Sequence, residues 1–373
     1  MKNNEMERYF KENDKALLSM IDSKVFLDNI NAFELSMRDN CIIQEVHRPT
    51  QDYHFLHETA IIEYKGVLFA SWYNNEKVEL FGRSPIRGRR SSDGGKTWTE
   101  VEVIIDDPDE KILYCPPVYG ICDGKLYMFI NEMVSADFMH ALDLFVYDET
   151  SQKFKMLWSR PIPFKINTNV QVLPNGKLML PGRIAELDSF PNTPAILISD
   201  SGKIDAEWRL VKIMENGNLP NGNEFEHPEC SAIINNGKIY MFCRNTDRCI
   251  VPIVFVSEDN AETWKMYSHD IPFADSKIYT GTLSNGCNYV IGNIMPDRKK
   301  LAILFSKKGT MQFDKGFLLA DKQCFKDYNG KQWSYPCAYE SQGKLYVIYS
   351  ATIDMFEQEC RGAVLSIIDL SLI

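Results

Sequence analysis

Ser91-Ser92-Asp93-Gly94-Gly95-Lys96-Thr97-Trp98 is a polar turn closed by a tryptophan, and related turns recur further along the chain. Short Asp and Ser side chains hydrogen-bond the backbone of their own turn, glycine tolerates a positive φ, and tryptophan packs a large apolar face on a sheet. A degenerate copy, Ser257-Glu258-Asp259-Asn260-Ala261-Glu262-Thr263-Trp264, has Ala261 where the first copy has glycine. Turns of this kind stabilise a fold without performing chemistry, so they indicate repeated structural units.

A second motif recurs once in each repeat, like the Asp-containing turn. It is a turn with glycine, usually followed by lysine and by a strand of aliphatic and aromatic residues. Its six glycines are 58, 52, 61, 49 and 57 residues apart, at Gly66, Gly124, Gly176, Gly237, Gly286 and Gly343. An Asp-containing turn or its remnant follows each of the first five, at Asp93, Asp148, Asp200, Asp259 and residues 306–309. Because this period accommodates four strands per unit, the sequence predicts an all-β, six-bladed β-propeller. Coincident hairpins in an ordinary β-sandwich are the alternative.

The two ends of the chain complete this prediction. The sixth unit ends early, because Ala363 to Ile373 provides only its third strand. We expect Cys41 to Glu45 to supply the outer strand, which closes the ring and removes a free sheet edge. Apolar residues at three- and four-residue steps between Glu5 and Ile21 predict a short amphipathic helix. The predicted organisation is a helical extension over residues 1–40 and a propeller over residues 41–373.

Composition restricts the partners and the compartment. The chain of 373 residues carries a net charge of −10, which argues against nucleic acid or an anionic membrane as a partner. Ten cysteines at irregular spacings, with no C-x-x-C pair, predict free thiols in a reducing compartment. The N-terminus lacks the apolar region of a signal peptide, and no apolar run reaches membrane-spanning length. We therefore expect a cytoplasmic protein with a small, locally recognised partner.

The form of the first turn, Ser-x-Asp-x-Gly-x-x-Trp, is similar to the Asp-box, or BNR repeat, of the sialidase-type β-propellers. The resemblance extends from Asp52 to Leu370, and a few positions in it bear on chemistry. Glu229 and Arg244 resemble the glutamate and the carboxylate-binding arginine of the family's fourth blade, and Arg298 resembles an arginine of its fifth blade. Tyr335 resembles the tyrosine of the sixth blade, which is the catalytic nucleophile.

The resemblance implies a retaining, exo-acting glycoside hydrolase that releases a terminal sugar from a small oligosaccharide or glycoside. Tyr335 would attack the sugar, and Glu229 would take its proton, because a tyrosine with an ordinary pKa of about 10 is a weak nucleophile without a base. Tyrosine nucleophiles are the exception among retaining glycosidases that sialidases represent. Arg244 and Arg298 would hold a substrate carboxylate through bidentate hydrogen bonds.

The first blade departs from the family pattern. Where sialidases begin the inner strand with Arg-Ile-Pro, this chain has His57-Glu58-Thr59, so one arginine of the carboxylate clamp is missing and His57 is the expected substrate contact. We therefore extend the expected substrate from sialic acid to another acidic or rare sugar. The family's general acid is an aspartate before the first Asp-box, and at that distance the chain has Glu79, with Glu76 as second choice. A glutamate transfers the same proton if burial raises its pKa toward the working pH.

Two other functions are open at this level. His57, Tyr335 and an arginine would also suit a lyase that abstracts a proton beside a uronic acid, and related propellers can bind carbohydrate without catalysis. We expect neither a cofactor nor a metal, because His54, His57 and His227 have no diagnostic ligand spacing. The sequence does not indicate an oligomeric state.

Overall fold

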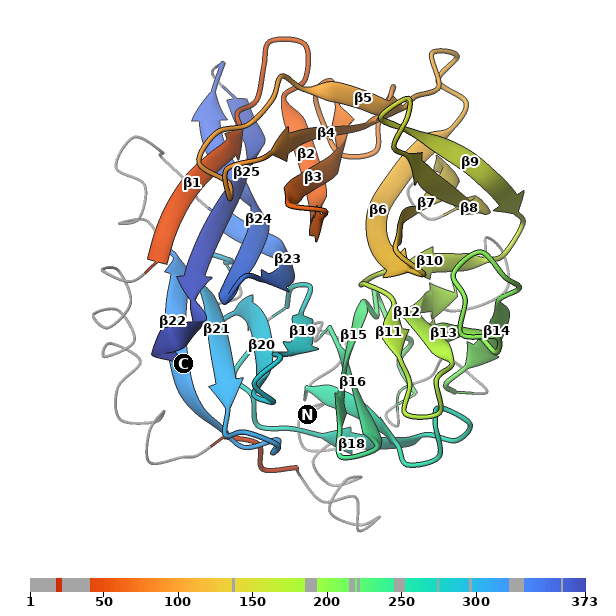
Figure 1. Cartoon of the computed structure of the whole chain (residues 1–373), viewed down its shortest axis with the longest axis vertical. Coiled ribbons are helices and arrows are strands. Elements are labelled where there is room, and N and C mark those ends of the chain that lie inside the picture. Colours follow the sequence, from red (N-terminus) through yellow and green to blue (C-terminus); the bar gives the residue numbers. More distant parts are fainter. Residues whose placement is uncertain are drawn as a thin grey trace.

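Figure 1 shows the computed structural model of the chain, in which six small sheets surround a central axis. The structure describes residues 18–21, 41–135, 138–184, 193–214, 219, 222–244, 252–273, 275–294, 297–321, 332–356 and 358–373. Among these residues the only helix is a single 3-10 turn, Leu370–Leu372. The prediction of an all-β, six-bladed propeller is confirmed.

The six blades follow one another along the chain, and neighbouring strands in each blade pair antiparallel. Blade 1 consists of β2 (Phe55–Tyr64), β3 (Val67–Asn75), β4 (Ile86–Ser91) and β5 (Glu102–Ile105). Blade 2 consists of β6 (Leu113–Cys122), β7 (Lys125–Ser135), β8 (Phe138–Asp148) and β9 (Lys153–Arg160). Blade 3 consists of β10 (Phe164–Ile166), β11 (Gln171–Val172), β12 (Leu178–Ile184), β13 (Thr193–Ser199) and β14 (Arg209–Lys212).

The remaining blades have the same plan. Blade 4 consists of β15 (Cys230–Asn235), β16 (Lys238–Cys243), β17 (Ile253–Ser257) and β18 (Lys265–Ser268). Blade 5 consists of β19 (Tyr279–Thr282), β20 (Asn288–Asn293), β21 (Leu301–Ser306) and β22 (Phe313–Ala320). Blade 6 consists of β23 (Gln332–Ser341), β24 (Lys344–Met355), β25 (Gln358–Asp369) and β1 (Cys41–His47).

Both sequence markers occupy the positions that the repeat predicts. The six glycines lie in the first hairpin of their blades and have φ values between +70° and +88°, which residues with a side chain rarely adopt. The Asp-containing turns connect the third and fourth strands of blades 1 to 4, and the remnant leads from β21 to β22. Blade 3 differs in one respect, because its inner strand is interrupted and both β10 and β11 pair with β12.

The Asp-containing turns are held by their own side chains. In the first copy, Ser91 Oγ accepts from the amide of Gly95 at 2.8 Å, and Asp93 accepts from the amide of Thr97 at 2.9 Å. The second copy has the same contacts, with the amide of Ala261 in place of the glycine amide at 3.0 Å. The alanine therefore preserves the turn, although it adopts a φ of +72°.

The ring closes as the sequence predicts. Strand β1 pairs with β25 in a register that runs from Cys41 opposite Ile368 to Glu45 opposite Val364. Figure 1 shows β1, near the start of the chain, beside β25, near its end. Residues from both ends thus complete one sheet, which leaves β25 without a free edge.

The described part of the N-terminal segment, residues 18–21, is extended and packs outside the ring. Leu18 bridges to His269 and Ile21 to Phe313, and Asp270 accepts from the amide of Met20 at 2.7 Å. The segment therefore ties the outer edges of blades 4 and 5 together. The helix predicted between Glu5 and Ile21 therefore does not include residues 18–21, and its other residues lie outside the described ones.

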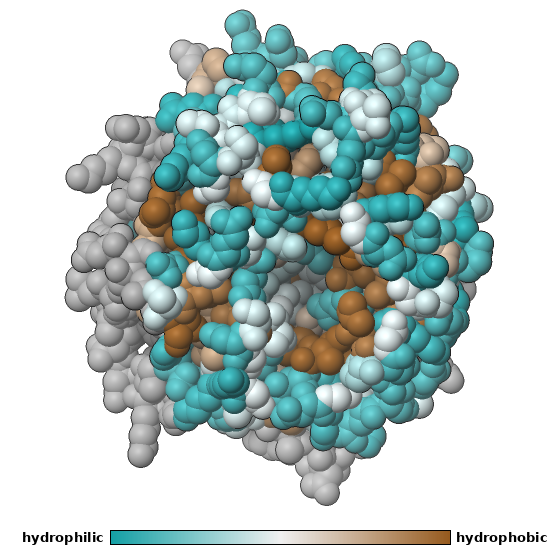
Figure 2. Space-filling view, viewed as in Figure 1, coloured by the Kyte–Doolittle hydropathy of each residue, from teal (hydrophilic) through white to brown (hydrophobic). Residues whose placement is uncertain are grey.

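Apolar side chains fill the spaces between blades. Separate clusters join blades 2 and 3, blades 3 and 4, and blades 4 and 5, and the largest cluster extends over blades 5, 6, 1 and 2. Figure 2 shows a mostly hydrophilic face with a hollow at its centre. No helix among the described residues is long and apolar enough to cross a membrane. Because the spaces between the blades are filled by apolar side chains, the polar side chains that point toward the axis define the candidate site.

Candidate active site

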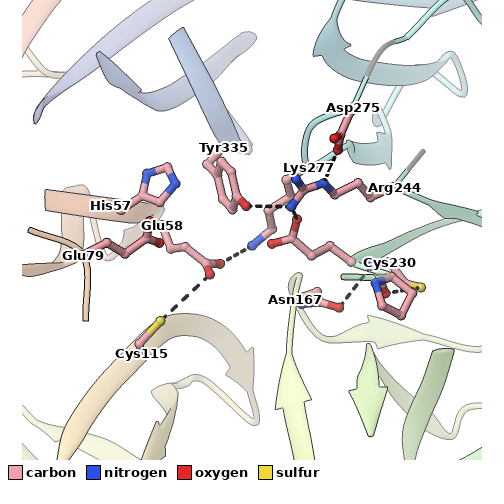
Figure 3. A network of polar contacts seen from close by, with 12 residues as sticks. His57, Glu58, Glu79, Cys115, Asn167, Cys230, Arg244, Asp275, Lys277 and Tyr335 are labelled. Atoms are coloured by element: carbon pink, nitrogen blue, oxygen red, sulfur yellow. Dashed lines mark hydrogen bonds and ion pairs between the residues drawn. The ribbon is translucent and has the colours of Figure 1, made fainter. Parts of the chain in front are cut away.

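Three inner strands have a β-bulge at the same end of the channel. The register shifts occur at Glu58 in β2, at Cys115 in β6 and at Tyr335 in β23. A bulge inserts an extra residue into one strand and changes the direction of its side chain. Glu58 and Tyr335 also have positive φ values, +47° and +57°. All three side chains turn toward the space between the blades, as Figure 3 shows.

Arg244 connects the residues from blades 4 and 6. Its Nη1 donates to Glu229 Oε2 at 2.9 Å and to the hydroxyl of Tyr335 at 3.0 Å, while its Nε donates to Asp275 Oδ1 at 2.7 Å. Figure 3 shows this guanidinium between the phenol and the two carboxylates. The structure thus brings together Tyr335, Glu229 and Arg244, which lie up to 106 positions apart in the chain.

The charges around these residues set their protonation. Burial alone would raise the pKa of Glu229, but the cations Arg244, Lys277 and Arg183 outweigh it and hold that pKa at about 2. Burial and the charge of Glu229 raise the pKa of Tyr335 well above its ordinary value. At neutral pH the unliganded site therefore contains an ionised Glu229 and a neutral phenol.

His57 and Arg298 contact the ring of Tyr335 from blades 1 and 5. The centroids of the His57 and Tyr335 rings are 4.0 Å apart, and Arg298 Cζ lies 5.5 Å from the Tyr335 centroid. His57 is buried, with 1% of its surface exposed, while Arg298 is half-buried. All three residues chosen from the sequence for substrate binding, His57, Arg244 and Arg298, therefore lie at the same mouth of the channel as Tyr335.

Glu79, the first choice for the general acid, lies on the exposed loop between β3 and β4. Its Oε1 accepts from the hydroxyl of Tyr73 at 2.7 Å, and Figure 3 shows it at the His57 side of the group. The charge of Glu76 acts instead on Tyr53 and Arg83. The geometry therefore favours Glu79 over Glu76.

One buried ion pair in the channel was not predicted from the sequence. Lys277 Nζ, from the segment before β19, lies 2.5 Å from Glu58 Oε2 in β2, and both side chains are less than a tenth exposed. The same Nζ is 5.6 Å from the centroid of the Tyr335 ring. Burial would lower the pKa of Lys277, but Glu58 and Glu229 outweigh it and raise that pKa, so the amine is charged. This pair links blade 5 to blade 1 directly beside Tyr335.

Two arginines at the site were also missed. Arg183, in β12, is 5% exposed, its Nε and Nη1 have no hydrogen-bond partner, and its charge helps to keep Glu229 ionised. Arg361, in β25, donates from Nη1 to His57 Nε2 at 3.1 Å. Among the described residues no carboxylate forms an ion pair with Arg183, Arg298 or Arg361. The mouth of the channel therefore has unneutralised positive charge, which favours an anionic ligand.

A regular sequence signal would have found several of these residues. The seventh residue after each blade glycine is polar although the second strands are otherwise largely apolar, and these residues are Tyr73, Asn131, Arg183, Arg244, Asn293 and Ser350. Asn131 and Asn293 bond the backbone of the next blade's inner strand, and Ser350 bonds His57 of the next blade. Aligning the repeats on their glycines would have indicated Arg183 as the counterpart of Arg244.

The side chains at this site offer two kinds of chemistry. They include a phenol, two carboxylates of different exposure and several guanidinium groups, which can bind an anion and transfer protons. Within the described ranges, no group of three or more His, Cys, Asp or Glu residues is placed to hold a metal ion. Every described cysteine is a free thiol.

These features define a class of protein: a six-bladed β-propeller with a tyrosine, a glutamate and an arginine in contact at one mouth of its channel. The chain belongs to the BNR repeat-like domain family, whose model matches residues 85–347. No curated protein matches the chain.

Solved structures share the fold at low sequence identity. A protein of unknown function from Dyadobacter fermentans superposes with a TM-score of 0.68 at 14% identity, over 88% of this chain and 99% of that chain. Trypanosoma rangeli sialidase has a TM-score of 0.65 at 13% identity, over 89% of this chain and 60% of that one. A variant of NanB sialidase from Streptococcus pneumoniae has a TM-score of 0.64 at 10% identity, over 88% and 71% of the two chains. The likeness shows a sialidase-like propeller fold.

Proposed function

We propose that the protein is a retaining, exo-acting glycoside hydrolase of the sialidase type, which releases a terminal acidic or rare sugar from an oligosaccharide. One observation carries the proposal: Arg244 Nη1 joins the hydroxyl of Tyr335 and the carboxylate of Glu229, at 3.0 and 2.9 Å. A nucleophile, a base and an anion-binding group are thus in contact at the place where the repeat brings the blades together. Trypanosoma rangeli sialidase, which has this fold, has been solved in complex with sialic acid.

In the first step, the oxygen of Tyr335 bonds to the anomeric carbon, and the glycosidic bond breaks with transfer of a proton from Glu79 to the leaving oxygen. A phenol becomes strongly acidic as its oxygen bonds to carbon, so even a weakly basic Glu229 can accept the phenol proton at that moment. In the second step, Glu79 takes a proton from water, and the water oxygen displaces Tyr335 from the sugar. The phenol then recovers its proton from Glu229.

The charge of the mouth supports an acidic sugar. Arg244 is already paired with Glu229 and Asp275, whereas Arg298 has no ion pair among the described residues. A substrate carboxylate bound at Arg298 and at the free edge of Arg244 would gain charge-assisted hydrogen bonds and place the anomeric carbon near Tyr335. Without an arginine at His57, we expect binding of the carboxylate to be weaker than a three-arginine clamp would provide.

A panel of sialosides, uronosides and deoxysugar glycosides tests the proposal with the purified protein. We expect one class to release a sugar with retained configuration, and Tyr335→Phe to lower kcat by about 10³-fold or more because the covalent step is lost. Glu79→Gln should lower kcat most for poor leaving groups, which need the proton. Tyr240→Phe, at a half-buried tyrosine of blade 4, is the matched control and should retain activity.

Other results would refute the proposed function or favour one of the two alternatives. Absence of released sugar from every glycoside in the panel refutes the hydrolase. An unsaturated product that absorbs in the ultraviolet and contains no solvent oxygen would indicate the lyase instead. Ligand binding that survives Tyr335→Phe, in a protein without turnover, would indicate a carbohydrate-binding propeller.

A further inference from the structure

His57 has no ring nitrogen available to a substrate. Its Nδ1 lies 2.8 Å from Ser350 Oγ, and its Nε2 lies 3.1 Å from Arg361 Nη1. A guanidinium has only donors, so Nε2 must accept, and the proton of the neutral ring must be on Nδ1. The two contacts fix both the tautomer and the orientation of a side chain that is 1% exposed.

The ring of His57 supports Tyr335. The two rings lie 4.0 Å apart between centroids at an interplanar angle of 50°. Phe55 and Tyr73 contact His57 edge-on, with centroids at 5.8 and 6.2 Å. Tyr335 needs such support, because a bulky residue at a φ of +57° is held there only by its surroundings.

Arg361 is itself held in place. Its backbone amide donates to the carbonyl of His54 at 2.9 Å, and its Cζ lies 4.7 Å from the centroid of the Phe55 ring. It comes from β25 in blade 6, whereas His57 and Phe55 come from β2 in blade 1. The Arg361 and His57 contact therefore spans the junction between the last and the first blade.

The cations around His57 favour its neutral form. The cations that act on it are Arg361, Arg298, Lys277 and Arg244. The carboxylates on the same side, Glu58 and Glu79, are bonded to Lys277 and to the hydroxyl of Tyr73. Burial and these cations hold the pKa of His57 well below its ordinary value.

We propose that Arg361 is a positioning residue that locks His57 as a neutral aromatic support for Tyr335. This inference rests on the proposed function and adds a residue that positions its nucleophile. Because the ring of His57 is buried and both of its nitrogens are occupied, the sugar carboxylate binds at Arg244 and Arg298 and not at His57. This supporting role replaces the expectation that His57 contacts the substrate.

Nitrogen NMR of the full chain with labelled histidines tests, without a substrate, whether Arg361 fixes the tautomer of His57. In the wild type, the His57 signals, assigned by their loss in His57→Gln, should show the proton on Nδ1 and no titration between about pH 5.5 and 8.5. Arg361→Met should release the tautomer, so that the proton is shared between Nδ1 and Nε2, and it should raise the pKa of His57, which burial still holds below its ordinary value. Arg361→Gln, which keeps an N–H donor, should restore the Nδ1 tautomer.

Arg87→Met is the matched control, because Arg87 also lies over an aromatic ring, 4.4 Å from the centroid of Tyr53, and no contact joins it to His57. This variant should leave the His57 signals unchanged. A wild-type His57 that has its proton on Nε2, or that titrates near pH 6.5, overturns the proposal. Identical His57 signals in Arg361→Met and Arg87→Met would also overturn the proposal.

Kinetics on the active glycoside give a second readout. Arg361→Met should lower kcat by about 10- to 100-fold and leave KM within about twofold, because it misplaces the nucleophile and not the substrate. In a His57→Phe background, Arg361→Met should have no further effect, since the contact is already absent. A rise in KM confined to acidic substrates would show that Arg361 binds the carboxylate, and it would overturn the proposal. Absence of all turnover refutes the hydrolase alone, and the NMR result then decides this inference.

Discussion

At the site, Glu229 is a weak base and Tyr335 is a weak acid. The pKa of Glu229 is held at about 2, while that of Tyr335 is raised, so free proton transfer between them is unfavourable in the resting site. In the proposed mechanism, the proton therefore moves only as the phenol oxygen bonds to the sugar. For the proposed hydrolase, we do not expect Glu229 to produce the acidic limb of the pH–rate profile near neutral pH.

The lowered pKa of Glu229 predicts how stability depends on pH. The unfolded chain binds this proton near the ordinary value of 4.5 and the folded protein near 2, so the contribution of Glu229 is complete above pH 4.5 and lost as the pH falls to about 2. Urea denaturation across that window should show a steeper loss of stability for the wild type than for Glu229→Gln. The difference amounts to about 3 kcal/mol, from 1.36 kcal/mol per pKa unit. Parallel curves for the two proteins would contradict the assignment.

At the scale of the strand, two devices build the site. Bulges in β2, β6 and β23 turn inner-strand side chains toward the axis. In blades 2, 5 and 6, the polar residue seven positions after the glycine bonds the inner strand of the next blade. In blades 2 and 5 this residue is an asparagine that joins blades, and in blades 3 and 4 it is an arginine that acts on Glu229. The same position in the repeat therefore joins neighbouring blades in some cases and supplies positive charge to the site in others.

The asparagine that joins blades 2 and 3 predicts a loss of stability when it is replaced. Asn131 is fully buried, donates to the carbonyl of Phe164 at 2.8 Å and accepts from the amide of Ile166 at 2.9 Å. Asn131→Ala leaves both backbone groups of β10 unpaired, which should cost about 2 to 4 kcal/mol in urea denaturation. Asn175→Ala, in an exposed turn, is the control and should change stability by less than about 1 kcal/mol. Equal midpoints for the two variants would show that this link does not hold blades 2 and 3 together.

For the whole molecule, the closed ring is what makes distant residues neighbours. Glu58 and Lys277 are 219 positions apart and form a buried ion pair across the channel, between blades 1 and 5. Strand β1 closes blade 6 from the other end of the chain.

The ion pair predicts a large effect for a single substitution and a smaller one for the double. Lys277→Met leaves the charge of Glu58 buried without a partner, which should cost about 3 to 5 kcal/mol of unfolding free energy. Glu58→Gln combined with Lys277→Met removes both charges, and it should recover at least about half of that loss. Urea denaturation at pH 7 measures both. A Lys277→Met protein as stable as the wild type would mean that the pair makes no contribution to the ring.

The candidate site was predictable only in part. Tyr335, Glu229, Arg244 and Arg298 follow from the resemblance to the sialidase-type propellers, and the structure brings all four to one mouth. Lys277 and Arg361 were not predictable, because their significance depends on contacts with residues more than 200 positions away. Arg183 was accessible in principle, since it has the same spacing from its glycine as Arg244.

The sequence by itself determined the number of blades, their order and the strand that closes the ring, because turn chemistry and strand periodicity are local properties that a repeat copies six times. Only the tertiary structure decided the charges and roles inside the channel. The protonation of Glu229 depends on Arg244 of its own blade and on Lys277 and Arg183 of the two neighbouring blades, and the tautomer of His57 depends on Arg361 of blade 6. The distances between these groups are set by how the sheets pack around the axis.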